Sequence, residues 1–275
     1  MNSNLFMFMS SSLQTLEPVP IWLLEVGPSG STFGASTRTV FGSAVTMNLV
    51  EAELLKVGRE AYKKGAPWYF QQFLKIEAVA IGVGGLSNRV RIIDGDVLVL
   101  RRTHWFFQPD GVIHDICFSK TDGLNSIRYG NVYFNLTGRR LIGGPEMVAH
   151  SMSVTRKHAK ILKSDLGQGD SGDNSSESSW VFRSLRALCD PNAFTGFSEY
   201  WYLLSSAVFH FPSEVAFRLQ NPESPPYCAR VDSGLRSCPM NAADIIKKTR
   251  SSDPNALHVV FEAHDSTRVR GFGRD

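Results

Sequence analysis

Apolar and polar positions follow two different periods along the chain, so the pattern predicts both helices and strands. Between positions 48 and 65, apolar residues recur every three or four positions, which is the spacing of one helical face, and Gly65 is a suitable residue to end that helix. The run from 66 to 85 is strongly apolar, and Pro67 stands where a helix can begin. We predict that this run starts as a helix and continues as a strand.

Short alternating runs bounded by turn residues predict several strands. Four of these runs follow one another closely, at 88–93, 96–101, 104–108 and 111–118. Asp94-Gly95-Asp96 and Gln108-Pro109-Asp110-Gly111 supply two of the turns between them. The segments 126–136 and 147–162 have a similar β-rich composition, and "IWLLEV" (21–26) predicts one more short strand. The expected sheet is therefore mostly antiparallel.

The remaining segments complete a prediction of an α+β domain. A Ser/Gly-rich acidic run at 163–179 is typical of a flexible surface loop. Residues 180–211 predict a helix, a turn and a second helix, 241–250 a short helix and 256–264 a strand. We expect a partly ordered leader at 1–45, an α+β domain at 46–220, and a C-terminal extension at 221–275 packed on or flanking the domain.

Composition narrows the classes of protein that remain possible. The chain has 275 residues, 43% of them hydrophobic and 20% charged, with a net charge of +3, which does not suit a disordered tail or a polyanion-binding chain. The four cysteines form no Cys-x-x-Cys pair, so we predict reduced thiols, no zinc and no other metal or cofactor. No basic signal region and no membrane-length apolar run occurs in the sequence, which predicts a cytoplasmic location.

Two histidines flank one predicted turn. His104 and His114 are placed symmetrically about Pro109, so a hairpin centred there would make them cross-strand partners on one face. One imidazole could then act as a base while the other orients it and stabilises its charge. An aromatic-rich hairpin with two incidental histidines is the alternative interpretation.

The residues around these histidines resemble a known histidine box. Gly95-Asp96, an apolar strand at 97–99, His104-Trp105, Asp110-Gly111 and Val112-Ile113-His114 occur in the order found in the lecithin:retinol acyltransferase / H-rev107 family. That family is a circularly permuted branch of the NlpC/P60 papain-like thiol enzymes. The resemblance implies a permuted papain-like fold and transfer of acyl groups from lipids. It also implies that His104 is the general base and His114 the residue that orients it.

The resemblance further implies a cysteine nucleophile in an Asn-Cys box at the start of a helix, where the helix dipole favours the thiolate. No Asn-Cys pair occurs in this chain. Cys189 is our candidate, because it lies about where the box falls in the family and precedes Asp190-Pro191 and an apolar helix. In rival frames the box is Asn192-Ala193 or Asn255-Ala256, and the nucleophile is missing. Cys189 as a small buried core residue is an equally open interpretation.

Three other features resemble functional sites. Gly169-Asp170-Ser171-Gly172 resembles a serine-protease nucleophile loop, but its low-complexity surroundings favour a chance match. Gly82-Val83-Gly84-Gly85 lacks the remaining residues of a phosphate loop and favours a turn. Two small basic clusters, at 156–160 and near the C-terminus, could contact an anionic phospholipid surface or RNA, although such clusters are usually solvated faces.

The sequence therefore predicts a thiol-dependent acyltransferase or phospholipase. Its partners would be a lipid or acyl-ester substrate and, through the basic clusters, a peripheral membrane contact, and we do not expect nucleic acid. Two alternatives stay open. The first is an inactive member of the family that retains the fold as a binding or scaffolding module. The second is a lineage-specific structural or nucleic-acid-contacting protein in which the histidine motif is a chance match.

Overall fold

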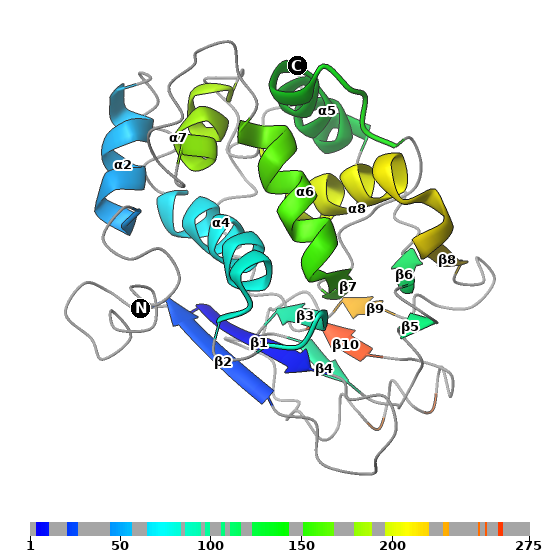
Figure 1. Ribbon diagram of the computed structural model, residues 1–275. Coiled ribbons are helices and arrows are strands. Elements are labelled where there is room, and N and C mark those ends of the chain that lie inside the picture. Colours follow the sequence, from blue (N-terminus) through cyan, green and yellow to red (C-terminus); the bar gives the residue numbers. More distant parts are fainter. Residues whose placement is uncertain are drawn as a thin grey trace, which may run out of the picture.

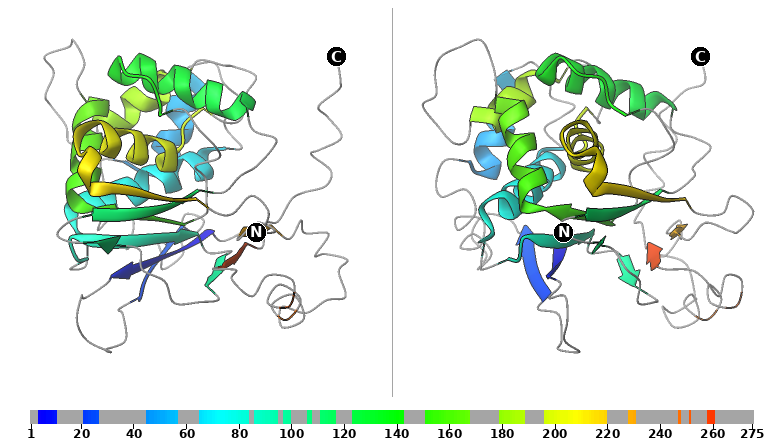
Figure 2. Two further views of the ribbon diagram at one scale, coloured as in Figure 1. Left: turned by 90° about the vertical axis from the view of Figure 1, so that its right-hand side faces the viewer. Right: turned by 45° about the vertical axis from the view of Figure 1, so that its right-hand side comes forward.

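Helices form one layer of the protein and strands the other (Figures 1 and 2). The computed structural model describes residues 4–10, 21–26, 45–56, 65–83, 86–94, 97–99, 106–107, 111–116, 123–142, 151–167, 179–188, 196–219, 228–230, 247, 251 and 258–260.

The strands belong to three small sheets with the orders β2-β1-β3-β7, β4-β10-β9 and β5-β6-β8. Within the described residues, pairing is antiparallel except for β10 with β9 and β6 with β8, which are parallel. The prediction of an α+β fold with mostly antiparallel pairing is confirmed. The strands are β1 (Asn4–Ser10), β2 (Ile21–Val26), β3 (Arg89–Asp94), β4 (Val97–Val99), β5 (Phe106–Phe107), β6 (Gly111–Ile116), β7 (Ser151–Thr155), β8 (Val215–Leu219), β9 (Cys228–Arg230) and β10 (His258–Val260).

The helical layer is built around α4, whose side chains are buried along almost its whole length. Helices α2, α6 and α8 contact α4, and α7 contacts α2 and α6. The helices are α2 (Met47–Lys56), α4 (Ala66–Ile81), α5 (Gly123–Thr137), α6 (Arg156–Gly167), α7 (Ser179–Arg186) and α8 (Glu199–His210), followed by the 3₁₀ turn η2 (Pro212–Glu214).

Alternate residues of β3 and β7 join the hydrophobic core beneath the helices. Val90 and Ile92 of β3 and Met152 and Val154 of β7 are all buried in that core. Aromatic side chains pack edge to face within it, as Phe73 of α4 does against Trp180 of α7 and Phe197 just before α8. Removal of this apolar surface from water is the main force that holds the two layers together.

Several predicted elements are confirmed. The strand at 21–26 is β2, the helix pair within 180–211 is α7 and α8, and β10 lies within the predicted strand at 256–264. Gly65 stands at the N-cap of α4, and Pro67 lies in its first turn, as predicted. The predicted end of the helix at 48–65 lies outside the described residues. The described part of the helix predicted at 48–65 is α2.

Four predicted elements are wrong in whole or in part. The loop predicted at 163–179 starts too early, because α6 continues to Gly167 and buries Leu166 in the core. The segment 126–136 lies in α5 and not in a strand, and the segment 147–162 contains β7 but turns into α6 at Arg156. The expected strand at the end of 66–85 is absent from the described residues of that run, because α4 continues to Ile81 and ends at Gly82 in the left-handed conformation (φ 67°).

Candidate functional site

The β5–β6 hairpin has the register that the two-histidine site requires. Phe106 pairs with Val112 and Phe107 with Gly111, so the described pairs are symmetric about position 109, as predicted. The ring of Phe107 lies so close to Gly111 that a Cβ at this position would overlap it. Gly111 therefore fits this hairpin because it has no side chain.

His114 is the one proposed catalytic residue within the described residues. Its side chain is 5% exposed and lies on β6, beside Phe217 of β8. His104 and Cys189 lie outside the described residues, as do Cys117 and Cys238. The structure therefore brings none of the three proposed catalytic residues together within its described part.

A buried polar cluster joins β3, β7 and the hairpin. Arg91 is 2% exposed, and its guanidinium donates to the hydroxyls of Ser153 (2.9 Å) and Ser151 (2.7 Å). Arg89, one pleat away, lies 5.3 Å from the centroid of the Phe106 ring. This contact ties β5 to β3 by a cation–π interaction.

A second buried cluster has a lysine at its centre. Lys75 of α4 lies 2.6 Å from Asp94 Oδ1 of β3 and 2.6 Å from Glu199 Oε1 of α8, and its side chain is 2% exposed. The backbone N–H of Glu199 donates to the side chain of Gln72 (3.1 Å). The cluster therefore connects helices α4 and α8 to strand β3.

The pKa values of this cluster are set by burial and by its charges. Burial acts to lower the pKa of Lys75, but the adjacent carboxylates of Asp94 and Glu199 outweigh it and raise that pKa above its usual value. Burial raises the pKa of the Glu199 carboxyl, although Lys75 opposes the shift. Burial also raises the pKa of the Tyr200 hydroxyl, and the negative charge of Asp94 adds to the effect. The lysine accordingly remains charged, as a buried ion-pair centre must.

A third cluster contains serine, aspartate and histidine, but its geometry is not that of a hydrolase triad. Ser206 is fully buried and donates its hydroxyl hydrogen to Asp165 Oδ2 (2.9 Å) rather than to the imidazole. His210 Nε2 and Arg139 both contact Asp165, at 3.0 and 2.9 Å. A nucleophilic serine needs a base as its hydrogen-bond partner and access to substrate. The cluster is better explained as a link between α6, α8 and the segment after α5.

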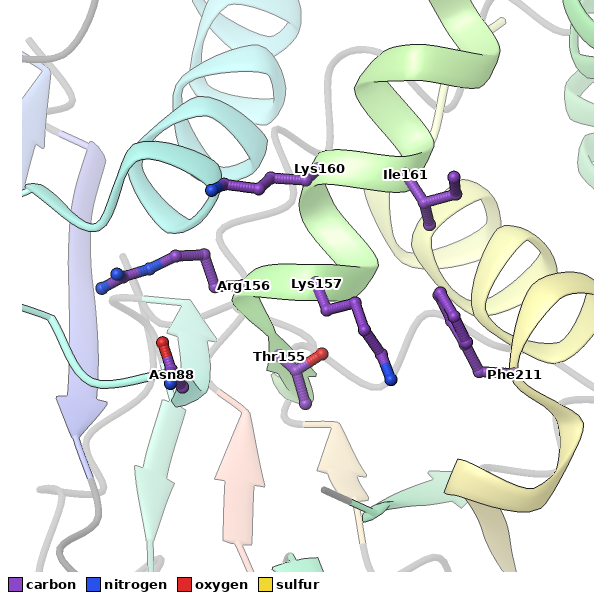
Figure 3. Close-up of a pocket in the computed structure, with 7 residues that line it drawn as sticks. All are labelled: Asn88, Thr155, Arg156, Lys157, Lys160, Ile161 and Phe211. Atoms are coloured by element: carbon purple, nitrogen blue, oxygen red, sulfur yellow. The ribbon is translucent and has the colours of Figure 1, made fainter. Parts of the chain in front are cut away.

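A basic pocket lies where β7 passes into α6 (Figure 3). Its volume is about 520 Å³, and the lining residues are Asn88, Thr155, Arg156, Lys157, Lys160, Ile161 and Phe211. Arg156 and Lys160 extend to one side of the helix start, whereas Lys157 extends toward Phe211 on the other side (Figure 3). The sequence identifies a basic cluster at 156–160 but does not indicate that a pocket lies beside it.

Neither metal coordination nor a membrane-spanning helix is found in the described part of the chain. No group of three or more His, Cys, Asp or Glu side chains there is placed to hold a metal ion. None of the helices in that part is long and apolar enough to cross a membrane. Comparison of the chain with protein-family models, curated protein sequences and solved structures gives no match.

Proposed function

We propose that the chain is a thiol-dependent acyl-transfer protein resembling the lecithin:retinol acyltransferase / H-rev107 group, with a permuted papain-like architecture and a lipid ester or amide as substrate. The observation that supports the proposal is the register of the β5–β6 hairpin, symmetric about position 109 and carrying a buried His114. The proposal requires His104 to lie opposite His114 and a cysteine thiol, assigned to Cys189, within about 4 Å of His104.

In the proposed mechanism, His104 takes the proton of the Cys189 thiol and the thiolate attacks the acyl carbonyl carbon. The tetrahedral intermediate breaks its bond to the leaving alcohol or amine, which receives the proton from His104, and a thioester remains on the cysteine. His104 then removes a proton from water or from a second alcohol or amine, which releases the acyl group. His114 holds the His104 ring in the required tautomer and stabilises its charge.

The proposal can be tested by labelling the full chain with an acyl probe that reacts with thiolates. We expect labelling of the wild type, and a decrease of about 10²-fold or more in Cys189→Ala and His104→Ala, since each removes one half of the nucleophile–base pair. Cys228→Ala is the matched control, because Cys228 lies on β9 and has no role in the mechanism. Equal labelling of all four proteins would exclude Cys189 as the nucleophile.

A second candidate function is an inactive relative that binds acyl lipids without cleaving them. It is favoured by the absence of an Asn-Cys pair from the sequence. If this candidate is correct, neither Cys189→Ala nor His104→Ala changes the labelling. The wild type nevertheless binds a non-hydrolysable acyl ether, and His114→Asn weakens that binding. If the wild type shows neither labelling nor binding, both candidates are wrong.

A further inference from the structure

The basic pocket at the start of α6 has a polar end and an apolar end. Asn88, Arg156 and Lys160 form the polar end, and Ile161 and Phe211 form the apolar end (Figure 3). A volume of about 520 Å³ is within the range of pockets that hold small molecules, roughly 300–1,000 Å³. His114 is not among the described residues that line this pocket, and the inference uses none of the residues of the proposed thiol chemistry.

The positive charges of the pocket differ in how far they are already neutralised. Lys157 lies 2.5 Å from Glu214 Oε1 and 4.2 Å from the Phe211 ring centroid, so its charge is balanced within the protein. Arg156 donates to the neutral carbonyl of Leu86 and therefore keeps its full charge. Lys160 is exposed and has no ion-pair partner in the part of the chain that the structure describes. The polar end thus has a surplus of two positive charges.

The side chains, rather than the helix terminus, must supply the binding energy. The backbone N–H of Arg156 donates to the carbonyl of Asn88 (2.8 Å), and that of His158 donates to the hydroxyl of Thr155 (3.1 Å). Two of the N–H groups that a helix start usually offers to an anion are therefore occupied. Lys160 and Arg156 remain as the groups that can bind one.

We propose that this pocket binds a phosphomonoester with an apolar substituent. A phosphomonoester carries a charge of about −1.5 to −2 at neutral pH, which matches the surplus at the polar end, whereas a carboxylate would neutralise only half of it. The apolar substituent lies against Ile161 and Phe211. The same chemistry is present in free small phosphates and in the headgroup of phosphatidic acid, and the experiment separates these two sources.

The test is isothermal titration of the full chain with phenyl phosphate, inorganic phosphate and benzoate. We expect phenyl phosphate to bind more tightly than either of the others, because it alone offers both a near-dianion and an apolar group. Lys160→Gln lowers the affinity for phenyl phosphate by roughly tenfold, because one charge-assisted hydrogen bond is lost, and Lys160→Arg retains most of the affinity. Ile161→Ser lowers the affinity for phenyl phosphate but leaves the affinity for inorganic phosphate unchanged.

Arg140→Gln is the matched control. Arg140 is exposed on the segment after α5 and does not line the pocket, so its loss changes the net charge of the chain equally and leaves the affinity unaltered. Parallel flotation with phosphatidylcholine vesicles, with and without phosphatidic acid, identifies the source. Lys160-dependent capture by the phosphatidic acid vesicles supports a lipid headgroup, and Lys160-dependent binding of phenyl phosphate alone supports a free phosphate. Equal affinities of wild type and Lys160→Gln for phenyl phosphate would overturn the proposal, whatever the outcome of the acyl labelling.

Discussion

Lys75 links the helical layer to the sheet through two buried ion pairs. Its ammonium group holds Asp94 of β3 and Glu199 of α8, each at 2.6 Å, in a part of the protein where water is nearly excluded. A buried ion cluster is not necessarily more stable than apolar packing would be. Removing the cation alone is costly, because two neighbouring carboxylates then lose the positive charge that they share.

We predict that Lys75→Met lowers the free energy of unfolding by about 3–5 kcal/mol, as expected when one partner of a buried ion cluster is deleted. Urea denaturation monitored by circular dichroism measures this loss. Lys56→Met is the control, because the Lys56 side chain is 73% exposed in its pair with Glu53 and its loss should cost at most about 1 kcal/mol. Similar losses in the two variants would show that the cluster around Lys75 does not stabilise the fold.

The sequence contains no local sign of this cluster. Lys75 reads as one polar position within an apolar helical run, and its partners lie 19 and 124 residues further along the chain. Sequence patterns report periodicity and turn chemistry, which are local, whereas this cluster exists only after α4, β3 and α8 have packed. The same limit holds for the pocket, because its lining residues Asn88 and Phe211 are far apart in the sequence and come together only in the folded protein.

At the scale of elements, two helix ends with the same backbone conformation provide a matched pair. Gly82 after α4 and Gly138 after α5 both have a φ of 67°. A Cβ on Gly82 would overlap the guanidinium of Arg156, whereas a Cβ on Gly138 would meet nothing within 4 Å. The two positions therefore separate backbone strain from steric overlap.

We predict that Gly138→Ala costs roughly 1 kcal/mol, the strain of a left-handed alanine, and that Gly82→Ala costs measurably more. The additional loss arises because Arg156 must leave the carbonyl of Leu86. Thermal unfolding of both variants measures the difference. Equal melting temperatures would mean that Arg156 moves aside without cost.

Helix α5 contains the segment 126–136, for which composition predicted strands. Its β-branched and aromatic residues favour strands by propensity. The buried positions Tyr129, Val132, Tyr133 and Leu136 nevertheless recur at helical spacing, so this periodicity, which the prediction did not use, indicates the helix where composition does not. The hairpin at 106–112 was predicted in the correct register because its turn residues and alternation agree. The start of α6 was missed because its cap, Thr155, also ends a strand.

At the scale of the whole molecule, three buried groups among the described residues make the stability of the protein depend on alkaline pH. The pKa of Lys75 is raised by its two carboxylates, that of Tyr133 by burial and the nearby Asp165, and that of Tyr200 by burial and Asp94. In each case the folded state holds its proton at a pH where the unfolded state releases it. The free energy of unfolding must therefore fall as the pH rises above the ordinary values of these groups.

We predict that this fall begins near pH 10, since the ordinary pKa values are 10.0 for the tyrosines and 10.5 for the lysine. Urea unfolding between pH 8 and 11.5 measures it. Tyr200→Phe removes one of the three groups, so its stability should decrease less steeply with pH than that of the wild type, whatever its stability at pH 8. Identical slopes would show that Tyr200 ionises alike in both states.

The parallel pairing of β8 with β6 also determines when the protein can fold during its synthesis. Val112 pairs with Val215 and His114 with Phe217, although about a hundred residues separate the two strands. The strand carrying His114 pairs early with β5, but most of the chain must be translated before its second neighbour, β8, exists. Pairings of such long range form slowly and leave unpaired strand edges exposed in the meantime. A nascent chain arrested before residue 215 should consequently require chaperones, even though its core helices are nearly complete.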